Sequence, residues 1–108
     1  MNRTPDALAD LGRFSEPALL LLVSLADGPK HGYAMTQDIQ RVSGQKLGPG
    51  TLYGAIARLE SRGWIEPLPA EDRRRPYRLT GAGQRVLRVR LASLRAVTRV
   101  GQSRLADV

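Results

Sequence analysis

The sequence predicts a mainly α fold with a two-stranded β-ribbon, arranged as a winged helix-turn-helix followed by a long C-terminal helix. Apolar residues recur at helical spacing in three short segments, and glycine or proline interrupts the chain after each of them. The pattern then changes to alternation limited by prolines, and a fourth helical pattern follows. A chain of 108 residues is long enough for one such domain with appendages.

The first long helical segment extends to about Ala26 and is apolar on every side, so it needs cover on more than one face. Residues 1–14 precede it, and we expect an N-terminal arm or a short helix there. Leu8, Leu11 and Phe14 are spaced three apart in this arm, as on one face of a helix.

The next two helices are predicted over residues 31–42 and 48–62, with a break at Ser43 and Gly44 between them. Apolar spacings of four and three place one face of each helix toward the core. The expected inward positions are Met35, Ile39, Val42, Leu52, Ile56 and Leu59.

A β-ribbon is expected after Gly63, because Tyr77 and Leu79 alternate and the nearby prolines suit only exposed strands. Thr80 then caps a long fourth helix. The predicted organisation is therefore an arm over residues 1–14, a winged helix-turn-helix domain over 15–80 and a C-terminal dimerisation helix over 81–108.

The formal net charge of +7 indicates a polyanionic partner such as nucleic acid. The chain has no cysteine, which excludes disulfides and thiolate metal sites and favours a cytoplasmic protein. Its longest apolar run is too short to span a membrane. The single histidine, His31, is expected to make a structural hydrogen bond, and no catalytic, metal or cofactor motif is recognisable. We therefore expect a protein that is not an enzyme.

In a helix-turn-helix the second helix enters the major groove of duplex DNA, so residues 48–62 are the candidate reading helix. Its outward side carries small residues, which permit close approach to another surface. The ribbon tip over residues 69–76 would lie on the DNA backbone or in the minor groove, although its carboxylates could neutralise its arginines. The candidate DNA-binding residues are Thr51, Tyr53, Gly54, Arg58, Arg73, Arg74 and Arg75.

The fourth helix has more leucines on one face than its own chain can cover, which predicts a homodimer. Arg90 lies within this face, where it must either extend toward solvent or pair with a carboxylate across an interface. The candidate dimer-interface residues are Leu20, Leu87, Leu91, Leu94 and Val97.

Three segments carry a resemblance to a known family: EPALLLLVSLADGPKHGY, GPGTLYGAIARLESRGWIEP and RRRPYRLTGAGQRVL. In these segments the chain resembles the PadR family of bacterial transcriptional regulators, in its compact subgroup with a short C-terminal region. The resemblance implies a dimer formed through the C-terminal region, and a repressor that a small-molecule effector releases. Family members often have proline where this chain has Gly54. The only tryptophan, Trp64, is on the ribbon, so an effector pocket lined by tryptophans of the last helix is not expected.

Two functions remain open at this stage. The first is a DNA-binding transcriptional regulator, expected to be a repressor that reads duplex DNA as a homodimer. The second is a winged-helix module for protein interaction with little or no DNA binding. Their dependence on salt separates them, because contacts to phosphate weaken strongly as the salt concentration rises.

Overall fold

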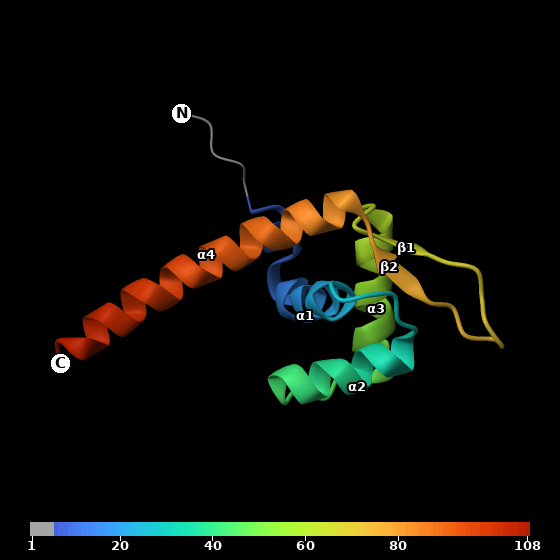
Figure 1. The fold of residues 1–108 in the computed structure, drawn as a ribbon, viewed down its shortest axis with the longest axis horizontal. Helices are drawn as coiled ribbons and strands as arrows, with labels where there is room; N and C mark the ends of the chain where they lie inside the picture. The colour runs from blue at the N-terminus through green and yellow to red at the C-terminus, as the bar shows by residue number, and fades with distance from the viewer. Residues whose placement is uncertain (1–5) are drawn as a thin grey trace.

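A computed structural model describes residues 6–108, apart from the side chains of residues 13 and 15. The first five residues of the predicted N-terminal arm lie outside this range. The elements follow the predicted order: a 3₁₀ helix η1 (Ala7–Phe14), α1 (Ser15–Leu25), α2 (Gly32–Ser43), α3 (Pro49–Ser61), β1 (Ile65–Pro67), β2 (Tyr77–Leu79) and α4 (Gly81–Ala106). Figure 1 shows α1 to α3 gathered on one side of α4, with the ribbon and the far end of α4 at opposite ends of the molecule.

Helix α1 lies at the centre of the fold, as its all-round apolar character predicts. It packs against η1, α2, α3, α4 and β2. Leu21, Leu22 and Leu25 are fully or almost fully buried, while Leu20 is half-buried against the core. The arm completes this cover, because Leu8 and Leu11 of η1 also lie in the core. Their spacing of three matches the period of the 3₁₀ helix that forms there.

Helices α2 and α3 form the expected helix-turn-helix pair. Met35 and Ile39 of α2 are buried, and so is the inward stripe of α3. The prediction for Val42 was wrong, because its side chain is 62% exposed. The C-terminal turn of α2 projects beyond the neighbouring helices (Figure 1). Gly44 ends the helix in the left-handed conformation.

Strands β1 and β2 pair antiparallel, with Ile65 opposite Leu79. The ribbon has an additional backbone partner that the sequence did not indicate. Lys30, in the loop before α2, exchanges two backbone hydrogen bonds with Tyr77, at N···O distances of 3.1 and 3.0 Å. This bridge attaches the middle of the ribbon to the start of the helix-turn-helix.

The predicted cap of α4 is confirmed, since the Thr80 hydroxyl accepts a hydrogen bond from the Gly83 N–H at 3.0 Å. Leu87, about two turns into the helix, is 6% exposed and belongs to the protein's own core. It is therefore unavailable to the dimer interface predicted from the sequence.

Beyond Leu87 the helix leaves the body of the protein, and residues 91–108 are all exposed. The exposed apolar side chains of this part of α4 include Leu91, Leu94, Val97, Val100 and Leu105.

Arg90 does not pair across an interface, because its Nη1 donates to Asp6 Oδ2 of the same chain at 2.8 Å. This partner is separated from it by 84 positions, so no local pattern could indicate it.

The start of α4 passes so close to Trp64 that only glycine fits at position 83. A Cβ atom added to Gly83 would lie 2.0 Å from the Trp64 carbonyl oxygen and 2.8 Å from Leu79 Cδ1. We expect Gly83→Ala to lower the free energy of unfolding by about 1–3 kcal/mol, the usual cost of overpacking. Chemical denaturation would measure the change.

Gly81→Ala provides the matched control for this substitution. It adds the same methyl group to the same turn of α4, where the nearest atom is Arg85 Nη1 at 3.7 Å. Its stability should therefore stay within about 0.5 kcal/mol of the wild type. Equal stability of the two variants would contradict the close packing of α4 on Trp64.

Candidate nucleic-acid interface

The outward side of α3 is open to solvent, and its centre is built from small residues. Gly50, Ala57 and Ser61 are exposed, and Gly54 is half-buried. Glycine inside a helix costs about 1 kcal/mol relative to alanine, so two of them on one exposed side need another explanation than helix stability. These small residues leave this side of α3, which we call the trough, without long side chains apart from the Arg58 guanidinium beside Gly54.

Two of the predicted reading residues border this trough with exposed side chains. Thr51 lies near the N-terminal end of α3, and Tyr53 is 59% exposed on the other flank. The Tyr53 hydroxyl lies over the start of α2, where a Cβ atom on Gly32 would be only 3.1 Å away. Tyr53 therefore packs against Gly32 of α2 on one side, while the rest of its side chain stays accessible to solvent.

The ribbon tip stands beside α3, as the prediction requires. A cleft of about 270 Å³ separates the two. It brings Tyr53 together with the three ribbon arginines, and it also contains residues that we had not assigned to the site. Its lining residues are His31, Gly32, Tyr33, Tyr53, Arg73, Arg74, Arg75 and Tyr77.

The carboxylates of the tip do not line the cleft beside α3. The three arginines border the cleft beside α3, whereas Glu71 and Asp72 line a neighbouring depression that Arg74 and His31 also border. No ion pair joins these carboxylates to Arg73, Arg74 or Arg75 in the described part of the chain. The side of the tip that faces α3 is therefore the basic one.

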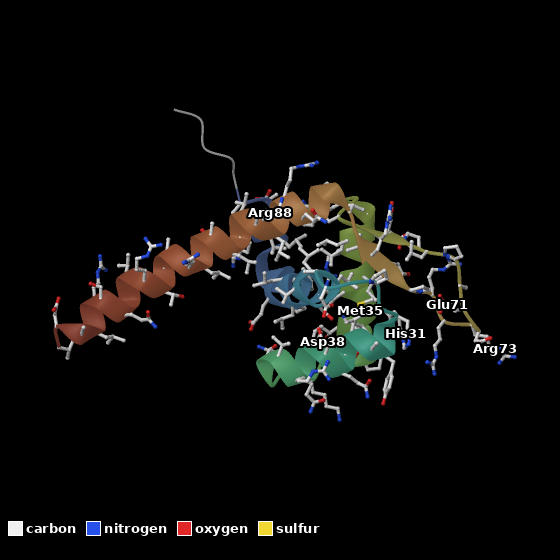
Figure 2. All side chains as sticks on the ribbon, viewed as in Figure 1. His31, Met35, Asp38, Glu71, Arg73 and Arg88 are labelled. Carbon is white, nitrogen blue, oxygen red and sulfur yellow. The ribbon has the colours of Figure 1, made fainter. Side chains whose placement is uncertain are left out.

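Each arginine of the tip is held differently. Arg75 Nη1 donates to the Leu68 carbonyl oxygen at 2.9 Å, which fixes this side chain along the ribbon. Arg74 Nη1 lies 3.4 Å from His31 Nε2, so the histidine has the structural contact expected for it. Arg73 is exposed at the extreme tip, as Figure 2 shows.

The turn that carries Arg73 is tight and has an unusual backbone. Glu71 and Arg74 exchange two backbone hydrogen bonds of 2.7 and 2.8 Å around the two residues between them. Asp72 and Arg73 both have positive φ angles, +47° and +69°. Such two-residue turns favour asparagine and glycine, so an arginine in this position costs stability.

Tyr77 forms part of the cleft floor, and burial raises the pKa of its hydroxyl, with the Glu60 carboxylate adding to the effect. Both causes disfavour the phenolate. The side chain therefore keeps its proton and adds no negative charge to the basic cleft.

Arg58 lies apart from the cleft. Its guanidinium carbon is 3.9 Å from the centroid of the Phe14 ring, and it also packs beside Gly54. In this position it covers the N-terminal arm and does not project from α3. To contact a DNA base, the Arg58 guanidinium would have to move away from the Phe14 ring. The role of Arg58 in DNA binding therefore stays a prediction.

The described residues contain no group of three or more histidine, cysteine or acidic side chains placed to hold a metal ion. Within the same residues, none of the helices has both the length and the apolar character that crossing a membrane requires.

Comparison with known proteins agrees with this geometry. Residues 21–89 match the model of the transcriptional regulator PadR-like family. The chain is 45% identical over 96 residues to an uncharacterised 37.1 kDa protein of transposon Tn4556 from Streptomyces fradiae, covering 88% of this chain and 28% of that protein. It is also 40% identical over 72 residues to the transcriptional regulator Rv3488 of Mycobacterium tuberculosis, covering 64% of this chain and 66% of that one. It thus spans less than two thirds of the length of either relative.

Solved structures share the same fold. A transcriptional regulator from Clostridium thermocellum superimposes with a TM-score of 0.73 at 26% identity, covering 88% of this chain and 94% of that one. A PadR-like transcription factor from Bacteroides fragilis gives a TM-score of 0.75 at 20% identity, covering 89% of this chain and 96% of that one. The predicted fold, a winged helix-turn-helix with a long last helix, is confirmed. The family match covers more than half of the chain, which therefore belongs to the PadR-like family of transcriptional regulators.

Proposed function

We propose that this protein represses transcription by binding an operator in duplex DNA as a homodimer, with α3 in the major groove. The observation that carries the proposal is the open, small-residue side of α3 beside the basic side of the ribbon tip. A helix fits the major groove, and small side chains bring its backbone close to the base edges. Thr51 and Tyr53 would then bond to phosphates or base edges on either flank.

The ribbon tip would contact the adjacent DNA backbone or minor groove. Phosphates carry most of the affinity in such complexes, and arginine binds them through several N–H groups. In the cleft, a phosphate oxygen would meet the Tyr53 hydroxyl on one side and the tip arginines on the other. Arg73, at the extreme tip, would extend farthest along the backbone.

The exposed half of α4 supports the homodimer. Its leucines and valines form an apolar stripe with no cover from the described part of the chain. A second copy of the same helix would bury this stripe symmetrically and present two α3 helices to the same duplex. Leu91, Leu94 and Val97 are the central contacts that we propose, and the half-buried Leu20 would lie nearer the body.

Repression follows from occupancy alone, because a bound dimer excludes other proteins from the promoter. An effector of unspecified chemical class would act by changing the separation or orientation of the two α3 helices in the dimer. The competing function, a module for protein interaction, would use the same apolar surfaces without the basic cleft.

The salt dependence of DNA binding tests the proposal against this competitor. After selection of a preferred duplex from a random pool, its affinity should fall roughly 10³-fold or more between 50 and 200 mM salt. Fluorescence anisotropy would give the dissociation constants. Failure to select any duplex, or an affinity that is insensitive to salt, would favour the competing function.

Arg73→Gly should have opposite effects on stability and on binding. Glycine tolerates the positive φ angle, so the free energy of unfolding should rise by up to about 1 kcal/mol. The loss of one phosphate contact should weaken binding to all sequences about equally and reduce the slope of log K against log salt by about 1.

Asp72→Gly is the matched control, since it relieves the same turn but removes an acidic group. It should gain stability without losing affinity for DNA. Unchanged binding by the Arg73→Gly protein would exclude this arginine from the interface.

The double substitution Leu91→Asp with Leu94→Asp should give monomers, because it places two carboxylates in the proposed apolar interface. Sedimentation velocity would show the change in mass, with circular dichroism to verify helix content. Ala92→Asp with Ala96→Asp introduces the same charges on the opposite side of α4 and should stay dimeric. A dimer of the Leu91 and Leu94 variant would place the interface elsewhere.

A further inference from the structure

The segment of residues 6–14 contacts two helices with different proposed tasks. At one end Asp6 pairs with Arg90 of α4, and at the other end Phe14 lies against Arg58 of α3. Between these ends, Leu8 and Leu11 are buried in the core. A short segment anchored at three places is well suited to fix the relative direction of the two helices it touches.

The Asp6 carboxylate is held from both sides. Its Oδ1 accepts the backbone N–H of Leu8 at 3.2 Å, which begins η1, while its Oδ2 accepts Arg90 Nη1 at 2.8 Å. The side chains of Asp6 and Arg90 are only 19% and 25% exposed, so water screens their attraction less than at an open surface. Arg90 lies directly before residues 91–108, the exposed part of α4. The ion pair therefore acts at the point where α4 leaves the body.

The other end of the segment is attached to the reading helix. The Arg58 guanidinium stacks on the Phe14 ring, and the Nε atom is buried without a hydrogen-bond partner among the described residues. The negative face of the ring offsets part of the lost contact with water. Phe14 is half-buried, so its position depends in turn on the core.

We propose that residues 6–14 are a brace that sets the direction of α4 relative to α3. In the homodimer this angle fixes the separation of the two reading helices, and hence the spacing of the two half-sites that the protein accepts. The dimer and its half-sites rest on the proposed function, whereas the angle within one chain does not. Asp6 and Phe14 act as positioning residues that touch no DNA.

An intrachain distance tests the brace without assuming DNA binding. The chain has no cysteine, so Ser61→Cys on α3 and Ser103→Cys on the side of α4 away from the apolar stripe would carry two spin labels. Mixing with an excess of unlabelled protein leaves only distances within one chain. Double electron–electron resonance should give one narrow distance distribution when the brace is intact.

Two substitutions weaken the brace at its two ends. Asp6→Asn keeps the acceptor oxygen that begins η1 but removes the charge, and Phe14→Leu keeps an apolar side chain but removes the ring face. Each should broaden or shift the distance distribution. The controls are Asp10→Asn, the same change at an exposed position of η1, and Phe14→Tyr, which keeps the ring. Both controls should keep the narrow distribution.

The DNA experiment uses duplexes in which the separation of the half-sites varies. The wild type should prefer one separation. In both weakened variants this preference should fall at least about twofold, the lower limit for residues that influence binding without touching the ligand. Unchanged distances in folded Asp6→Asn and Phe14→Leu proteins would refute the brace, and a change in only one would refute the need for both ends. Absence of DNA binding by the wild type, with the distances altered as expected, would instead refute the proposed function.

Discussion

The arrangement of the whole molecule depends on the contacts made by the backbone of Gly63 and Trp64. The Trp64 carbonyl oxygen accepts the Thr80 N–H at 3.0 Å, and the Thr80 hydroxyl donates to the Gly63 carbonyl oxygen at 2.6 Å. Trp64 also donates its own N–H to Leu59 in the last turn of α3. Gly83 completes this junction by bringing α4 onto the same carbonyl group. The end of the reading helix, both strands of the ribbon and the start of α4 therefore meet within a few ångströms.

This junction explains why the ribbon and α3 can act on one target. The base of the ribbon is fixed at Trp64 and Thr80, and its middle is fixed by the backbone bridge between Lys30 and Tyr77. With two points of attachment the ribbon cannot rotate freely about its base. Its basic tip stays beside Tyr53, so the cleft between them exists before any ligand arrives. Preorganisation of this kind lowers the entropy lost on binding.

The order of the elements, the cap at Thr80 and the open side of α3 could be predicted, because they depend on local spacing and on single residues with strong preferences. The sequence could not indicate what a side chain meets across the fold. Arg58 has the position of an outward residue on α3, yet the Phe14 ring attracts its guanidinium. Arg90 finds its carboxylate on the arm, and the ribbon joins Lys30, which carries no strand pattern. Val42 has the same helical spacing as the buried residues of α2, but it lies in the last turn of that helix, where the core no longer covers it.

In this protein the exposed half of α4 is not needed for folding of the domain, but under the proposed function it is needed for association of the subunits. These two requirements often depend on the same residues in small proteins. Residues 91–108 contribute nothing to the buried core of the described chain, so changes there leave the folding of the domain largely unaffected. Under the proposed function, those same residues decide which subunits associate. After gene duplication, two such regulators can diverge in this helix until they no longer form mixed assemblies, while each retains its fold and its operator.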